Sequence, residues 1–351
     1  MRGREGTLTL VALVLFVFFA ITADNFFTLS NVYDMARTST YLLIVGVALT
    51  FVFIAGEIDL SVGSLFGLCA VVMGLLIVKL GLDPWLAAFM TVGAGLLVGC
   101  INGGIVTNVG VPSFIVTLGM YSLLRGAALV ITGGLPLVFG ADALQSSFID
   151  LASGRIGDFP VVILWGVAVV VLGGCVLKLT IFGSHVYATG GNAGSAKAAG
   201  ISTNRVKFAC FAITGAACGL VAALQTALLS EANPTTGSGF ELQVIAAVII
   251  GGVSLTGGGG SVYGTVVGAA IVGMLPNGLV LMGVEANWNQ FFIGLIIVAV
   301  GTLEVALSRR RRSRRSERAS GSATDPLRDR GADGDGGEHA AAGAAGAARG
   351  Q

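Results

Sequence analysis

The chain has 351 residues, of which 54% are hydrophobic and only 11% are charged, and its mean hydropathy is +0.88. This composition excludes a soluble globular domain and predicts an all-α, polytopic membrane protein. The formal net charge is +1, but half of the 20 Lys and Arg residues lie beyond Ser308. We therefore divide the chain into a transmembrane domain, residues 1–308, and a basic, then Gly-, Ala- and Asp-rich cytoplasmic tail, residues 309–351, which we expect to be disordered.

Ten apolar stretches predict about ten transmembrane helices. Arg2 and Arg4 precede the first stretch, which places the amino terminus in the cytoplasm, although a cleaved signal peptide ending near Ala23 is the alternative. An even number of spans returns the carboxyl terminus to the same side, where the arginine cluster 309–315 follows. We therefore expect a multi-pass protein of the cytoplasmic (inner) cell membrane with both termini and the 180–205 loop in the cytoplasm. The stretches lie at about 8–21, 39–55, 64–80, 84–106, 112–132, 161–179, 207–229, 241–257, 261–281 and 288–306.

Residues 56–64 interrupt this apolar pattern with Glu57 and Asp59, between two runs that carry no charge. A charged side chain at the middle of a bilayer helix costs roughly 2.5–3.5 kcal/mol, so we expect a broken helix here. A similar Gly-rich string returns at 251–264 and predicts two internally similar halves, with broken helices near the centre, unless the repetition is fortuitous. The residues assigned to the breaks are Gly56, Asp59, Gly63, Gly251, Gly258 and Gly260.

Polar side chains near the breaks have two predicted roles. Asp59 is expected to accept hydrogen bonds from backbone groups that the break frees, rather than to bind substrate. Hydroxyl and amide side chains are candidates for the lining of a translocation pathway, and hydrogen bonds to neighbouring helix carbonyls are the alternative for them. These candidates are Ser61, Ser64, Asn102, Ser113 and Thr117.

The 190–201 segment is the candidate for contact with a separate energy-supplying subunit. It is Ala-rich and has glycines at both ends, so we predict a short helix that Gly200 ends in a left-handed cap, with an ordinary loop helix as the alternative. A bulky residue in place of Ala196 is expected to block docking. The residues assigned to this coupling loop are Asn192, Ala193, Gly194, Ser195, Ala196 and Gly200.

Motifs for chemistry on the chain itself are missing from the sequence. There is no Gly-x-x-x-x-Gly-Lys-Ser/Thr loop to hold ATP and no Ser-His-Asp arrangement. The two histidines, His185 and His339, have no Cys or His at ligand spacing, and all five cysteines lie in apolar runs. We expect no metal, no cofactor and no enzymatic activity; transport must draw on ions or on a separate ATPase.

Several blocks of the sequence, spread over residues 7–306, resemble the permease subunits of ABC importers for sugars of the ribose, xylose, arabinose and galactoside type. The resemblance implies a second permease copy or related chain, an ABC ATPase subunit that binds the ATP, an extracytoplasmic substrate-binding protein and a simple sugar substrate. The blocks are NFFTLSN at 25–31, IDLSVGS at 58–64, ING at 101–103, PSFIVTLG at 112–119 with Arg125, GGN at 190–192 before Gly200, and 251–264.

The chain departs from the family pattern at two points. The family's Glu-Ala-Ala-x-x-x-Gly coupling element falls on Gly194, Ser195, Ala196 and Gly200, which keep only the second Ala and the Gly, and Glu57 stands where many members have Gly. The competing hypothesis is an ion-coupled secondary transporter or channel that uses Glu57 and Asp59. An amino-acid permease of the same superfamily is a third possibility, which the 58–64 block disfavours.

Overall fold

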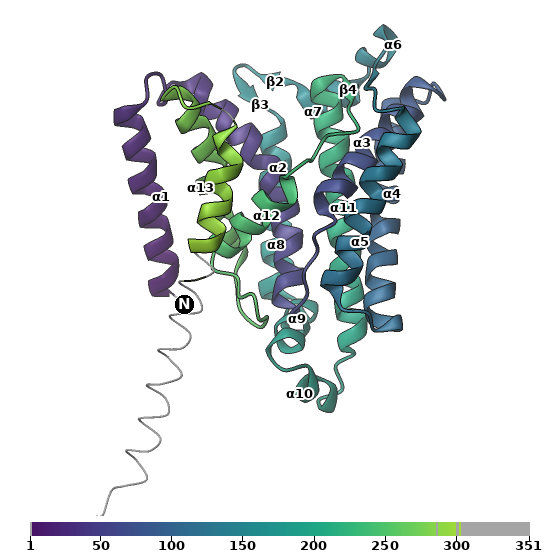
Figure 1. Cartoon of the computed structure of the whole chain (residues 1–351), viewed down its shortest axis with the longest axis vertical. Helices are drawn as coiled ribbons and strands as arrows, with labels where there is room; N and C mark the ends of the chain where they lie inside the picture. The colour runs from purple at the N-terminus through teal and green to yellow at the C-terminus, as the bar shows by residue number, and fades with distance from the viewer. Residues whose placement is uncertain (1, 286, 300–301, 303–351) are drawn as a thin grey trace, which may run out of the picture. The chain divides into compact units, whose positions relative to one another are not determined.

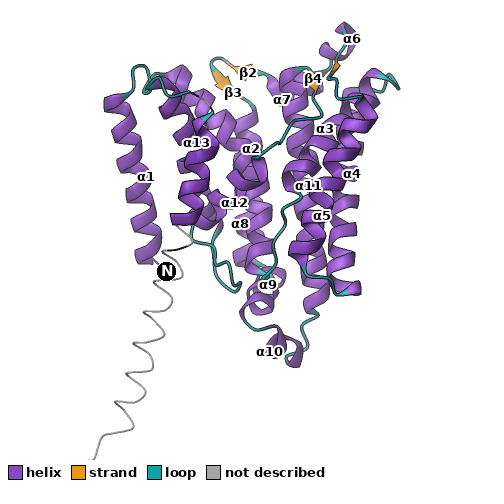
Figure 2. Cartoon of the chain, in the orientation of Figure 1, coloured by secondary structure: helices purple, strands orange, loops and turns teal. Residues whose placement is uncertain are grey.

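The computed structural model describes residues 2–285, 287–299 and 302 (Figure 1), and all elements below belong to one compact unit, Met1–Gly301. Helices make up almost all of it (Figure 2). Each of the ten predicted apolar stretches contains a helix. Six helices among the described residues are long and apolar enough to span a membrane, and the other four are shorter. The polytopic all-α class is therefore confirmed, while the 309–351 tail lies outside the described residues.

The six long helices are α2 (Leu29–Ile54), α4 (Pro84–Gly104) with its π-helical extension η1 (Ile105–Val109), α5 (Ser113–Thr132), α8 (Val162–Leu179), α11 (Thr203–Leu229) and α13 (Val262–Leu281). The other four are α1 (Arg2–Thr22), whose apolar part is the shorter Gly6–Thr22, and the short helices α3 (Val62–Val78), α12 (Phe240–Ile250) and Trp288–Ala299.

Short elements close the two ends of the helix bundle (Figure 2). At the upper end, the antiparallel pairs β1 (Leu137–Val138) with β4 (Glu231–Ala232) and β2 (Arg155–Ile156) with β3 (Phe159–Pro160) lie near α6 (Ala141–Leu144) and α7 (Ser147–Ser153). At the lower end, where α1 begins, lie α9 (Ile181–Gly191) and α10 (Ala193–Ala198).

Two predicted spans have the wrong bounds. Helix α2 begins at Leu29 instead of residue 39, because Thr28 caps it and the polar residues that follow extend the helix beyond its apolar part. Helix α12 ends at Ile250 instead of 257, because Gly252 adopts a left-handed conformation (φ +85°) that stops the helix. Hydropathy predicts the apolar part of a helix, whereas capping residues decide where the helix begins and ends.

Small residues allow the central helices to pack closely. Gly95 and Gly99 of α4 lie against Gly215 and Gly219 of α11, and a Cβ atom on Gly99 would overlap the carbonyl oxygen of Phe211. Lipid gives no hydrophobic drive for helix association, so close backbone approach must supply the attraction. Helix α11 is thereby fixed beside α4 and also contacts α2 and α3.

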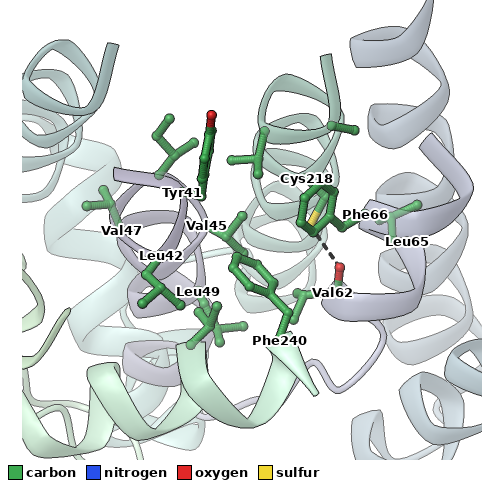
Figure 3. Close-up of a cluster of buried hydrophobic side chains, with 14 of the residues drawn as sticks. Tyr41, Leu42, Val45, Val47, Leu49, Val62, Leu65, Phe66, Cys218 and Phe240 are labelled. Carbon is green, nitrogen blue, oxygen red and sulfur yellow. Dashed lines mark hydrogen bonds between the residues drawn. The ribbon is translucent and has the colours of Figure 1, made fainter. Parts of the chain in front are cut away.

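An aromatic contact fills the space between α2, α3 and α12 (Figure 3). Phe240, the first residue of α12, meets Phe66 of α3 edge to face at 5.2 Å between ring centroids, next to Val45 of α2. At the start of α3, the Cys218 thiol of α11 donates to the Val62 carbonyl at 3.6 Å (Figure 3). Apolar packing therefore fixes the first turn of α3, directly after the first break.

The helices that precede the two breaks, α2 and α12, end in the same way. Gly56 (φ +83°) and Gly252 (φ +85°) are left-handed, and the amides of Glu57 and Val253 each bond to the carbonyl five residues earlier, Val52 and Val248. This is the Schellman motif, which satisfies the last carbonyls of a helix and needs glycine at the left-handed position. The internal repeat predicted from sequence is therefore a structural repeat at the helix ends.

The repeat does not extend to the starts of the following helices. Ser261 caps α13 by accepting the Gly264 amide at 3.1 Å. Ser64 stands in a similar Gly-Ser-x-aromatic-Gly string, 63–67 against 260–264, but it lies inside the first turn of α3 after Ser61. The sequence similarity of these two serines is therefore not a structural equivalence.

Candidate functional site

The first break, residues 55–61, runs without helical structure between α2 and α3 and contains a buried carboxylate. Asp59 is only 1% exposed, and its Oδ1 accepts the Ser61 amide at 2.9 Å and the Ser61 hydroxyl at 2.6 Å. The Ser61 amide has no helical acceptor, and the Asp59 carboxylate takes that place. An unpaired buried donor is costly, so this hydrogen bond stabilises the break. That Asp59 does not bind substrate stays a prediction.

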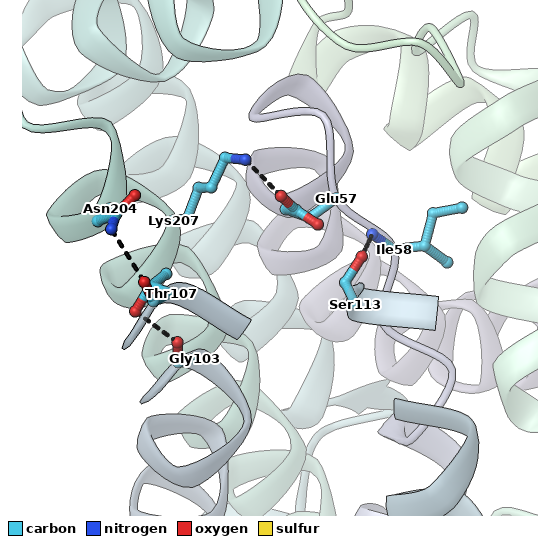
Figure 4. A network of polar contacts seen from close by, with 7 residues as sticks. All are labelled: Glu57, Ile58, Gly103, Thr107, Ser113, Asn204 and Lys207. Carbon is cyan, nitrogen blue, oxygen red and sulfur yellow. Dashed lines mark hydrogen bonds and ion pairs between the residues drawn. The ribbon is translucent and has the colours of Figure 1, made fainter. Parts of the chain in front are cut away.

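Helices α4 and α5 both contact this break. Asn102 of α4 donates its amide to the Ser61 hydroxyl at 2.9 Å, and Ser113 of α5 accepts the Ile58 amide at 3.2 Å (Figure 4 shows the second contact). Thr117 donates to the Ser113 carbonyl at 2.8 Å. The structure therefore gathers four of the five pathway candidates around residues 58–61, where they bond one another and the backbone.

Two buried polar atoms of the five pathway candidates have no hydrogen-bond partner in the part of the chain that is described. They are the Ser64 hydroxyl oxygen and the Asn102 side-chain oxygen. Such atoms are available to a hydroxyl-bearing ligand or to water. The lining of a pathway by these residues remains a prediction. A cavity of about 390 Å³ between α2, α4, α8 and α11 has other walls, which are apolar.

Glu57, the first acid of the break, is paired. Its carboxylate contacts the Lys207 ammonium of α11 at 2.5 Å (Figure 4), and the two side chains are 13% and 23% exposed. An acid whose charge is already compensated by a lysine is a poor coupling site for a cation. The pairing removes the main support for the ion-coupled alternative.

Two functional candidates that the sequence assignment missed are Arg125 and Glu241. Arg125 of α5 donates to the carbonyls of Pro234 and Thr236 at 2.7 and 2.8 Å, which holds the 233–239 connection against α3. Glu241, in the first turn of α12, is buried against Gly63, and its Oε2 has no partner among the described residues. The available signal was an ionisable residue inside an apolar stretch, the same signal that selected Glu57.

The second break, residues 251–261, lies against the first. The Gly258 amide donates to the Ile54 carbonyl at 2.8 Å, and Thr50 and Thr265 share a hydrogen bond of 2.6 Å between α2 and α13. Two segments that lie about 200 residues apart in sequence therefore meet by their backbones. Of the residues assigned to the breaks, Gly56 and Asp59 lie in the first break and Gly251, Gly258 and Gly260 in the second, while Gly63 lies in the first turn of α3.

Helix α10 forms where the coupling loop is predicted. Asn192 caps it by accepting the Ser195 amide at 3.0 Å, and Gly200 is left-handed (φ +84°), as predicted. Ala196, however, is only 4% exposed, because it faces the body of the protein, while Gly194 and Ser195 are exposed. A bulky residue at position 196 would disturb the permease's own packing, so the expectation that it selectively blocks docking is wrong.

The fold and these breaks define a helical membrane transport subunit built on interrupted spans. Over residues 31–301 the chain matches the family described as "Branched-chain amino acid transport system / permease component", and it belongs to this family.

Named relatives cover most of the chain. It is 35% identical over 292 residues to the ribose import permease protein of Escherichia coli (strain K12), covering 83% of this chain and 90% of that one. It is 33% identical to the autoinducer 2 import system permease protein of Photorhabdus luminescens (85% and 89% covered) and 32% identical to a probable ABC transporter permease protein of E. coli K12 (88% and 91%). No solved structure matches the chain.

Proposed function

We propose that the chain is the membrane-spanning permease subunit of an ABC importer that carries a simple sugar or a related small polyol into the cell. The observation that carries the proposal is similarity over nearly the whole length to import permeases, one of them for ribose. The match extends over 90% of the ribose import permease protein, so the similarity is not confined to one part of that relative.

The ATP is bound and hydrolysed by a separate ABC ATPase subunit, because the sequence holds no phosphate-binding loop of its own. Further partners are an extracytoplasmic substrate-binding protein and a second permease copy or a related permease chain. Helix α10, with Asn192, Ala193 and Gly194 at its start, docks on the ATPase in the cytoplasm, and both termini lie on that side of the inner membrane. The ion-coupled alternative has less support, since both acids of the first break are engaged within the protein.

The test is purification of the tagged full-length chain from its native membrane, with its subunits identified by mass spectrometry. The purified complex, in liposomes with ATP enclosed, is assayed for uptake of labelled D-ribose and a panel of pentoses, hexoses and polyols. We expect an ABC ATPase to co-purify, and uptake to require ATP and to persist with proton and sodium ionophores. Uptake that ionophores abolish and ATP does not support would refute the proposal.

A further inference from the structure

The end of α9 contacts both helix breaks at once. Gly190 lies against the Ile54 carbonyl, which a Cβ atom at this position would overlap, and such an atom would be 2.8 Å from the Gly258 amide nitrogen. One turn earlier on α9, the Tyr187 hydroxyl donates to the Gly260 carbonyl at 2.8 Å. A single segment therefore holds the end of α2 and the second break together.

Four glycines make this contact possible, and we name Gly56, Gly190, Gly257 and Gly258 the glycine junction. A Cβ atom on Gly257 would lie 2.9 Å from the Gly56 Cα and 2.8 Å from the Gly190 carbonyl oxygen. These neighbours are backbone atoms, which cannot move aside as a flexible side chain can. Three backbones are consequently packed with no side chain between them, an arrangement that transmits displacement instead of absorbing it.

The glycine junction lies next to α10 in the chain. Asn192 is the only residue between α9 and α10, so a shift of α10 acts directly on Gly190. After α10 the chain enters α11, whose Lys207 pairs with Glu57 of the first break. Helix α10 is thus bracketed by two contacts with residues 54–57, one before it and one after it.

We propose that the glycine junction is the element through which α10 moves both helix breaks together, with Gly190 as the positioning residue. The inference rests on the proposed docking of α10 to an ATPase and specifies how that docking reaches the pathway. When α10 is displaced, Gly190 carries the end of α2 and residues 257–258 with it, because each is in backbone contact with Gly190. Tyr187 on the same helix carries Gly260 through its hydrogen bond. Gly190 itself does not touch the substrate.

The chain offers a matched pair of substitutions. Gly190 and Gly191 are the last two residues of α9, and neither requires a positive φ. Alanine favours a helix over glycine at both positions. At Gly191, a Cβ atom would be 4.0 Å from the Gly258 Cα, an ordinary contact. The added Cβ atom therefore overlaps the neighbouring backbone of the glycine junction in Gly190→Ala and not in Gly191→Ala.

The experiment measures hydrogen–deuterium exchange in the permease–ATPase complex, with and without ATP and vanadate, at α10 and at residues 55–61 and 253–261. In the wild type and in Gly191→Ala, we expect trapping to change exchange at α10 and at both breaks. In Gly190→Ala, the change at α10 should persist, while the change at the breaks should fall at least about threefold. Equal responses of the breaks in both variants would overturn the proposal, as would breaks that do not respond in the wild type.

A second variant covers the case in which Gly190→Ala does not assemble. Tyr187→Phe removes the hydroxyl that bonds to the Gly260 carbonyl, and it should weaken the response of residues 253–261 while leaving that of 55–61 unchanged. An undiminished response at 253–261 would then overturn the proposal. If no ATPase associates with the wild-type chain, the proposed function fails instead, so the two failures are distinguishable.

Discussion

Replacing Asp59 by alanine should destabilise the permease much more than replacing it by asparagine. The carboxylate accepts two hydrogen bonds from Ser61, one from the amide and one from the hydroxyl, and Asp59 and Ser61 are both buried. Alanine leaves both donors without an acceptor, and an unsatisfied buried donor costs about 1–3 kcal/mol, so the loss is about 2–6 kcal/mol. Asparagine keeps a carbonyl oxygen in the place of Oδ1 and should retain most of both bonds.

The assay is thermal unfolding of the detergent-purified chain, followed by intrinsic tryptophan fluorescence. At about 2 °C per kcal/mol, the midpoint of Asp59→Ala should fall by about 4–12 °C. Asp59→Asn should lose less than half as much. Equal losses in the two variants would refute the claim that the hydrogen bonds from Ser61 account for the stabilisation. They would indicate that the charge of Asp59 stabilises the fold instead. No loss in Asp59→Ala would show that the break is held by other contacts.

Three further predictions follow from single contacts. Lys207→Met leaves the mostly buried Glu57 carboxylate unpaired and should cost about 1–3 kcal/mol, which the double variant with Glu57→Gln should largely recover in a double-mutant cycle of unfolding midpoints. Gly99→Ala should destabilise the chain by about 1–3 kcal/mol through overlap with α11, whereas Gly104→Ala, with open space around it, should be neutral or slightly stabilising; equal midpoints would contradict the close packing. Ala198→Trp, on the exposed face of α10, should abolish pull-down of the ATPase at an unchanged yield of folded permease, and pull-down at the wild-type level would contradict the docking assignment.

Much of this protein could be read from its sequence because the signals are local. Hydropathy over about twenty residues gives the spans, and a glycine after an apolar run gives the helix end, since only glycine adopts the left-handed position readily. The break at Gly56, its repeat at 251–252 and the short helix before Gly200 all rest on such neighbouring residues, although the left-handed glycine of the repeat is Gly252, one residue after the predicted Gly251. The same local character explains the wrong bounds of α2 and α12, since hydropathy carries no information on where a cap stops the backbone.

The contacts between these elements were decided only by the tertiary structure. The pairing of Glu57 with Lys207 spans 150 positions, and the Asn102–Ser61 bond joins α4 to the first break. The inward orientation of Ala196 and the closure of Gly190 on Ile54 likewise depend on how α9, α10 and α11 are placed. A sequence states which groups need partners, because burial of an unpaired polar group is costly. Which partner each group finds is set by helix packing, in which small residues far apart in the chain determine how closely the backbones approach.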